Sequence, residues 1–232
     1  LFSFFRGPYR FSHILEQVYF IGMKSVFIVS LTAIFSGMVL GLQGYYTLVK
    51  FGSEGLLGPA VALTLIRELG PVLTALMVTG RAGSAMAAEL GIMRISEQID
   101  ALDTMDIDPI HYMVTPKLVA AVISFPLLTA LFDVIGIFGG YLTGVVLLGI
   151  NSATYIVRME ESVVMKDITG GFIKAAFFAV LVATICCYQG YYTHKRAGGF
   201  GAKGVSYATT SAVVLASVTI LIADYILTSF LL

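Results

Sequence analysis

The sequence predicts an all-α integral membrane protein, and its composition carries that prediction. Of the 232 residues, 58% are hydrophobic and only 12% are charged, whereas a soluble domain carries about 25% charged residues. The mean hydropathy is +0.91. A soluble fold of this size would have too few charges to cover its surface, so lipid is the expected solvent for much of the chain.

Five apolar segments are long enough to cross a bilayer, since a spanning helix needs about 20 apolar residues. The third is long enough to tilt or to kink at Pro126. Ahead of the first, residues 1–20 mix aromatic and aliphatic side chains with Arg6, Arg10 and Glu16, which is typical of a helix lying in the headgroup plane. The predicted spans are residues 25–48, 56–79, 117–148, 168–192 and 208–232.

Basic residues predict the orientation of these spans, because they gather on the cytoplasmic side. With the N-terminus inside, nine Lys and Arg residues lie on the inner side and three on the outer side, and five spans place the C-terminus outside. The outer three are Lys50, Arg158 and Lys166; the inner nine are Arg6, Arg10, Lys24, Arg81, Arg94, Lys117, Lys195, Arg196 and Lys203.

Glycines recur at four-residue spacing in two of the spans, at Gly37 and Gly41 and again at Gly136, Gly140 and Gly144. Each group therefore lines one face of a helix, where the absence of side chains lets another backbone approach closely. Two interpretations are open: packing between helices of one chain, or a seam between two copies.

The segment from Glu89 to Asp108 follows the second span and holds six acidic residues and one basic residue, Arg94. Its apolar residues form one helical stripe, with Glu97, Asp100 and Asp103 on the other face; they are Ile92, Ile95, Ile99 and Leu102. We expect an amphipathic helix over residues 89–106. A helix that binds anionic lipid should be basic, so a protein partner is favoured over a solvated loop.

Ionisable residues also occur inside the predicted spans. A charge at the bilayer centre costs on the order of 3 kcal/mol, so these side chains should face a cavity or one another. A polar substrate path is the favoured interpretation, and a structural ion-pair network is the alternative. The residues are Arg67, Glu68, Asp133, Lys174 and Asp224.

Several function classes lack their sequence signals. The net charge is zero, so nothing suggests nucleic acid as a partner. The chain has no Walker A motif for ATP, and its three histidines lack metal-ligand spacing. No nucleophile and base are arranged for catalysis, so we expect a non-catalytic chain without a cofactor of its own. Cys186 and Cys187 are interpreted as buried apolar residues.

Several motifs in a fixed order closely resemble the MlaE family of permeases, over essentially the whole chain. They are Gly37–Gly44, Arg67–Pro71, Gly80–Ser84, Ala88–Arg94 with Glu97 and Gln98, and Asp108–Pro109. The resemblance implies one permease domain over residues 1–232, in the inner membrane of a bacterium. It also implies a homodimer that moves phospholipid and serves outer-membrane lipid asymmetry.

The same resemblance implies partners and site residues. The partners are a cytoplasmic ABC ATPase that binds ATP and magnesium, a periplasmic MCE-domain protein and, in many members, a STAS-domain protein. The helix after the second span is the coupling helix that docks into the ATPase; with the acidic face described above, its candidate residues are Arg94, Glu97, Gln98, Asp100 and Asp103. The charged positions near the lipid cavity map onto Arg67, Glu68, Asp167, Lys174 and Asp224.

Two other function classes were weighed. An ion channel or proton-coupled carrier would use Glu68, Asp133 and Asp224 as a relay and would work without an ATPase. A lipid-modifying membrane enzyme would need a catalytic cluster at the interface, and the sequence shows none.

Overall fold

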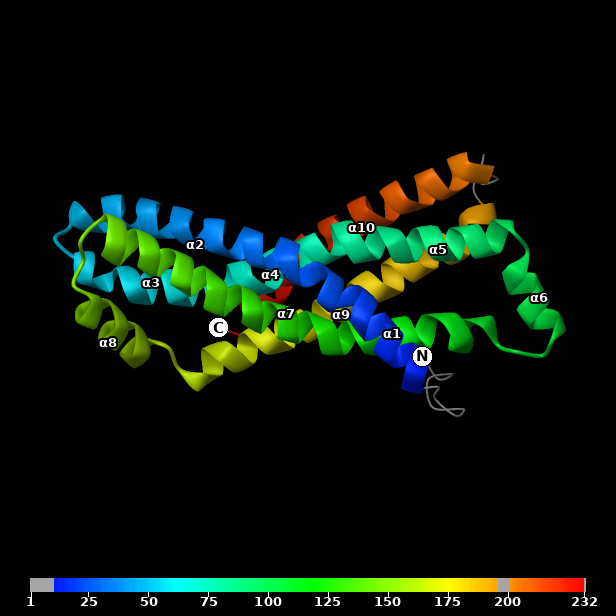
Figure 1. Ribbon diagram of the computed structural model, residues 1–232, viewed down its shortest axis with the longest axis horizontal. Helices are drawn as coiled ribbons and strands as arrows, with labels where there is room; N and C mark the ends of the chain where they lie inside the picture. The colour runs from blue at the N-terminus through cyan, green and yellow to red at the C-terminus, as the bar shows by residue number, and fades with distance from the viewer. Residues whose placement is uncertain (1–10, 196–200, 232) are drawn as a thin grey trace.

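The computed structural model describes residues 11–195 and 201–231 of the chain, and within these ranges it is helical with no strand (Figure 1). The predicted interfacial positions 1–10, which include Arg6 and Arg10, and the basic Arg196 lie outside the described residues. In chain order the α-helices are α1 (Phe11–Ile21), α2 (Val26–Val49), α3 (Leu57–Thr64), α4 (Gly70–Val78), α5 (Ser84–Ile95), α6 (Gln98–Thr104), α7 (Thr115–Tyr141), α8 (Ser152–Ser162), α9 (Met165–Tyr191) and α10 (Gly201–Leu231).

Among the described residues, five helical stretches are long and apolar enough to cross a membrane, which confirms the predicted fold class. The stretch that runs through α3, α4 and α5 is the longest, 42 residues from Glu54 to Ile95. At 1.5 Å per residue it is about 60 Å long, roughly twice the thickness of a bilayer core, so it must extend beyond the membrane. The other four are Ser12–Val49, Ile110–Leu147, Met165–Tyr191 and Gly201–Leu231.

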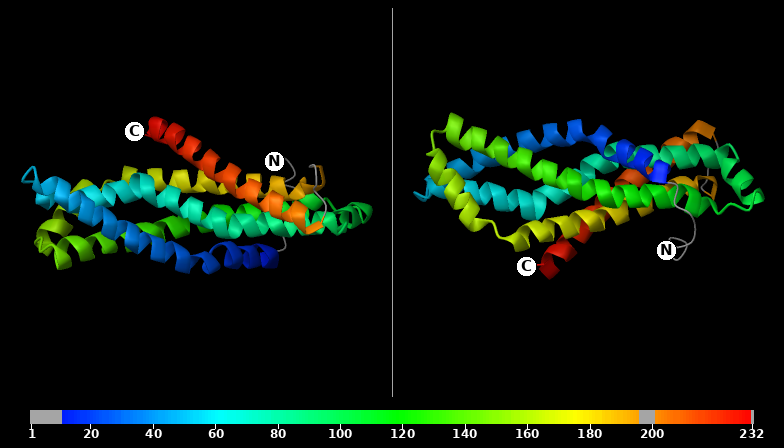
Figure 2. Two further views of the ribbon diagram at one scale, coloured as in Figure 1. Left: turned by 90° about the horizontal axis from the view of Figure 1, so that it is seen from above. Right: turned by 60° about the horizontal axis from the view of Figure 1, so that its bottom comes forward.

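The bundle has two distinct ends. Figure 1 shows α6 at one end of the long axis and α8 at the other, with the start of α1 in the half nearer α6. Both views of Figure 2 show α10 crossing the other helices at an angle, so that its C-terminal end projects from the bundle. Below, the two ends are called the α6 end and the α8 end.

A glycine seam joins α2 to α7. A Cβ atom added at Gly37 would lie 1.8 Å from the carbonyl oxygen of Gly136, and one added at Gly41 would lie 3.1 Å from that of Gly140. The two backbones are therefore in direct contact at these positions, where a side chain would force them apart. The glycine faces pack helices within one chain, as the first of the two interpretations expected.

The long second stretch contains two π-helical turns, Leu65–Leu69 and Thr79–Gly83. The first lies just before Pro71, which has no N–H to donate to the carbonyl of Arg67 one turn earlier. That carbonyl is thereby left without its ordinary α-helical donor. Wide turns of this kind are frequent at functional sites, and this one contains both Arg67 and Glu68.

Helix α1 is tied to the second π-helical turn. The Arg81 guanidinium donates to the Phe20 carbonyl and, at 2.9 Å, to the Ser25 hydroxyl, and it lies over the Phe20 ring. On its outer face, Leu15 and Tyr19 are more than half exposed. An apolar exposed face beside the first spanning helix agrees with a helix at the membrane surface.

The prediction of a single amphipathic helix over residues 89–106 is wrong, because the structure has two helices there. Helix α5 continues from the second span to Ile95, and Glu97 adopts a left-handed conformation with a φ of 60°. A left-handed residue ends an α-helix and redirects the chain, so α6 begins afresh at Gln98. The predicted stripe is broken with it, since Ile99 is fully buried while Ile92 is 55% exposed.

Candidate functional site

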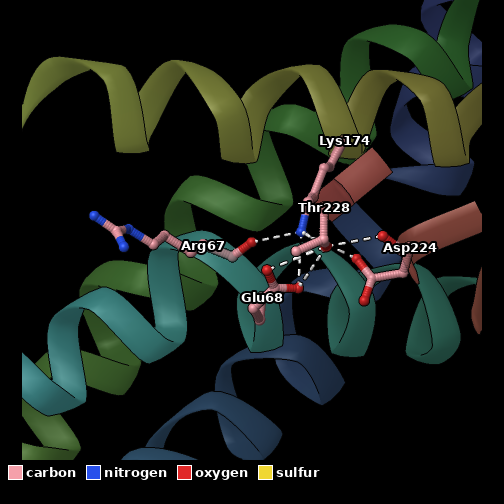
Figure 3. Close-up of polar contacts among 5 residues, drawn as sticks. All are labelled: Arg67, Glu68, Lys174, Asp224 and Thr228. Atoms are coloured by element: carbon pink, nitrogen blue, oxygen red, sulfur yellow. Dashed lines mark hydrogen bonds and ion pairs between the residues drawn. The ribbon is translucent and has the colours of Figure 1, made fainter. Parts of the chain in front are cut away.

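Lys174 is the centre of a polar cluster between three spanning helices. Its side chain is 3% exposed, and its ammonium group donates to Glu68 Oε2 at 2.8 Å and to the Thr228 hydroxyl at 2.7 Å. It also forms an ion pair with Asp224 Oδ1 at 3.2 Å. Figure 3 shows these side chains converging from α9, α10 and the π-helical turn before α4. The arrangement satisfies a buried cation with two acids and a hydroxyl.

The third hydrogen bond of Lys174 goes to a main-chain atom. The ammonium group donates to the Arg67 carbonyl oxygen at 2.9 Å, which is the acceptor that Pro71 leaves without a helical donor. The local sequence thus creates the acceptor that the lysine uses. We refer to Arg67, Glu68, Lys174, Asp224 and Thr228 as the charged junction.

The Arg67 side chain points away from Lys174 (Figure 3). Its Nε donates to Asp167 Oδ1 at 2.9 Å, and the same carboxylate accepts the backbone N–H of Val164 through its other oxygen. Asp167 therefore closes the first turn of α9 while it orients the arginine. The Arg67 side chain stays 40% exposed.

A cavity of about 290 Å³ opens beside the charged junction. Of its cations, Arg67 is partly exposed and Lys166 is exposed, whereas Lys174 is buried against the acids. Gly170 and Gly171 also line the cavity, and Gly171 lies against the Ile66 carbonyl. A guanidinium and an ammonium group at the mouth of a cavity are natural partners for a phosphate.

All five charged positions that the sequence assigned to the lipid cavity come together here: Arg67, Glu68, Asp167, Lys174 and Asp224. Asp133 does not join them. Its carboxylate lies against Gly70, where an added Cβ would be 1.9 Å from Oδ1, and this oxygen is buried without a hydrogen-bond partner among the described residues. Of the three acids in the relay hypothesis, Glu68 and Asp224 thus both contact Lys174, whereas Asp133 lies apart.

The candidate coupling residues divide into two groups. Glu97, Gln98, Asp100 and Asp103 are exposed around α6, where another protein can reach them. Arg94 instead turns inward, with its side chain 17% exposed, and donates to Asp100 at 2.7 Å and to His194 at 2.9 Å.

Sequence reasoning missed two residues of these clusters. Thr228 follows Asp224 by four positions and shares its helix face, and this spacing was the signal that could have found it. His194 bonds a residue 100 positions earlier, and no local pattern indicates such a contact.

Comparison with known proteins agrees with this architecture. The family model described as Permease MlaE matches residues 14–230, which is nearly the whole chain. The chain belongs to the MlaE permease family.

Relatives of this MlaE-family chain come from distant organisms. It is 46% identical to the intermembrane phospholipid transport system permease protein MlaE of Haemophilus influenzae over 96% of this chain and 84% of the relative. It is 47% identical to a probable ABC transporter permease protein of Rickettsia bellii over 97% and 85% of the two chains. A chloroplastic protein of Arabidopsis thaliana, TRIGALACTOSYLDIACYLGLYCEROL 1, is 36% identical over 97% of this chain and 63% of that protein.

Proposed function

We propose that this chain is the membrane-spanning permease subunit of an ABC transporter that moves phospholipid between the inner membrane and a periplasmic MCE-domain partner. The observation that carries the proposal is the exposed Arg67 guanidinium at a cavity inside an MlaE-family bundle. The Haemophilus relative is named for phospholipid transport, and a phosphate-bearing headgroup suits the two cations at this cavity.

The proposed lipid site follows from the position of the cavity along the bundle. The charged junction lies in the first half of α9, towards the α8 end, which the basic-residue bias assigns to the periplasmic side. Arg67 and Lys166 hold the phosphate, and apolar walls from the first, second and fifth spans of two paired copies hold the acyl chains. Asp167 keeps the guanidinium aimed at the headgroup.

The energy source in this proposal is a separate cytoplasmic ATPase that binds ATP and magnesium, so this chain itself is non-catalytic. Closure of the ATPase pushes on α6 at the α6 end. Because α5 and α4 continue in one helical stretch to Glu68 and Arg67, the displacement reaches the charged junction and changes the volume of the cavity.

The remaining partners are proposed from the family. The chain forms a homodimer in the bacterial inner membrane, with its N-terminus in the cytoplasm and its C-terminus in the periplasm. An MCE-domain protein covers the periplasmic side, and a STAS-domain protein joins the ATPase.

The direct test is lipid transfer by the complex in liposomes. The chain is co-expressed with its ATPase and MCE-domain partner, reconstituted with fluorescent phospholipid, and followed for exchange of labelled lipid with the MCE-domain protein. We expect exchange to depend on ATP hydrolysis and to be lost with a hydrolysis-deficient ATPase. Equal exchange by the chain alone would contradict the proposal and favour an ATP-independent carrier.

Coupling is tested by Glu97→Lys, which reverses an exposed charge at the bend between α5 and α6. We expect this variant to lose assembly with the ATPase or to lose lipid-stimulated ATPase activity, because an acidic docking surface is disrupted. Glu161→Lys on α8, an equally exposed charge at the opposite end, is the matched control. Normal lipid exchange by Glu97→Lys would contradict the assignment of this segment to the ATPase interface.

A further inference from the structure

The α6 segment is anchored to the end of the fourth span as well as to α5. Arg94, in the last turn of α5, donates through Nε to His194 Nδ1 at 2.9 Å and through Nη1 to Asp100 Oδ1 at 2.7 Å. Its guanidinium carbon lies 5.6 Å from the centre of the Tyr191 ring. One side chain therefore connects α5, α6, the end of α9 and the turn after it.

A small hydrophobic core supports the same connection independently. Ile99 of α6 is fully buried. It belongs to a buried cluster with Leu90 of α5, Cys187 of α9 and Met113, which lies just before α7. Tyr191 and Leu102 pack against this group, which is separate from the main core of the bundle. Helix α6 thus shares a buried cluster with α9 as well as with α5, and close-packed interiors transmit strain.

Both anchored helices lead to the charged junction. The stretch containing α5 carries Arg67 and Glu68, and α9 carries Lys174. A displacement that reached only the second span would pull Glu68 away from Lys174 and break a buried ion pair, which is costly in a membrane. A displacement delivered to both helices moves the two partners together.

We propose that Arg94 and His194 form a brace that delivers movement of α6 to α9 as well as to the second span, so that the charged junction moves as one unit. The brace rests on the proposed function, because it assigns a second route to the same coupling. Arg94 and His194 are positioning residues in this proposal and do not contact lipid or nucleotide.

The brace requires a neutral His194, because Nδ1 accepts the hydrogen bond from Arg94. Partial burial and the neighbouring charges of Arg94 and Lys195 lower the pKa of His194 from its ordinary value of 6.5, while Asp100 and a hydrogen bond to the Tyr191 backbone act in the opposite direction. The hydrogen bond from Arg94 to His194 is therefore present at neutral pH. It is lost when the pH falls below 6.5 and passes through the lowered pKa of His194.

The test compares His194→Ala with His194→Asn in the reconstituted complex, using lipid molecules exchanged per ATP hydrolysed. The side-chain oxygen of Asn can accept from Arg94 where Nδ1 does, so this variant preserves the brace. We expect His194→Ala to lower the ratio by about tenfold or more, the effect of losing one hydrogen bond to a charged group. His194→Asn should stay close to the unsubstituted complex.

The pH profile gives a readout that a merely structural role would not move. As the pH falls through the lowered pKa of His194, the exchange per ATP should fall for the unsubstituted complex and stay level for His194→Asn. The control is His13→Asn, at a half-exposed histidine of α1. An unchanged ratio in His194→Ala, or an equal loss in His194→Ala and His194→Asn, would overturn the brace. Absence of ATP-dependent exchange in the unsubstituted complex would instead overturn the proposed function.

Discussion

Two regions hold helices together in lipid in different ways. They are the glycine seam between α2 and α7 and the charged junction between the second span, α9 and α10. At the seam, Gly37 and Gly136 bring two backbones into direct contact without any polar side chain. At the junction, Gly171 of α9 lies against the Ile66 carbonyl, and beside this contact Lys174 joins the helices through hydrogen bonds and ion pairs. Both are stable in lipid, where apolar burial gives little drive for association.

The difference separates a rigid part of the molecule from an adjustable one. Backbone contact has one geometry, because any shift produces either a clash or a void. The junction combines one close backbone approach with side-chain hydrogen bonds and ion pairs, and it borders a cavity. We infer that α2 and α7 form a fixed frame, against which the charged junction moves as one unit.

The largest effect on stability should come from Lys174→Met at the charged junction. It leaves Glu68 and Asp224 as facing acids without their shared cation, and removing one member of a buried ion pair costs about 3–5 kcal/mol. The free energy of unfolding in mixed micelles measures this loss. Lys166→Met, at an exposed cation of the same cavity, should change it by less than about 1 kcal/mol; equal losses in both variants would contradict a buried network.

A smaller effect is expected from Gly37→Ala at the seam. The new Cβ would meet the Gly136 carbonyl at 1.8 Å, so α2 and α7 must separate at a cost of about 1–3 kcal/mol. Gly80→Ala is the control, because a Cβ there meets no atom within 4 Å. If Gly37→Ala unfolds at the same temperature as Gly80→Ala, the seam is not rigid.

Thr228→Val should cost about 1 kcal/mol, the net value of a typical hydrogen bond. It removes an acceptor of Lys174 while keeping the shape of the side chain. Thr219→Val in the same helix removes only a bond to the backbone carbonyl of Leu215, and its unfolding should match that of the unsubstituted chain. A larger loss at Thr219 than at Thr228 would contradict the assigned role of the junction.

Arg67→Ala should have the smallest effect on stability and a clear effect on transport. The arginine side chain is 40% exposed, and Asp167 keeps its bond from the Val164 backbone when the arginine is removed, so we expect a loss below about 1 kcal/mol. Lipid exchange per ATP should fall about tenfold with loss of one charge-assisted contact to phosphate. Unchanged exchange would remove Arg67 from the proposed headgroup site.

Sequence reasoning reached the spans and the junction because both depend on local chemistry. Apolar length predicts a spanning helix, and charges inside such helices must find partners, which brought Lys174 together with Glu68 and Asp224. It failed at Ser96 and Glu97, where one left-handed residue divides a pattern that remains periodic on both sides. It also could not place His194, since the contact with Arg94 depends on how α9 ends beside α5 and not on any spacing along the chain.

Because Pro71 cannot donate a hydrogen bond, one acceptor of Lys174 belongs to the peptide backbone and survives every change of side chain at position 67. An alanine scan of the side chains that accept from Lys174 would therefore leave this contact intact and underestimate how tightly the ammonium group is held. The contribution of this contact is tested by Pro71→Ala, which removes the proline ring. The substitution restores an N–H that competes with the lysine for the same carbonyl oxygen.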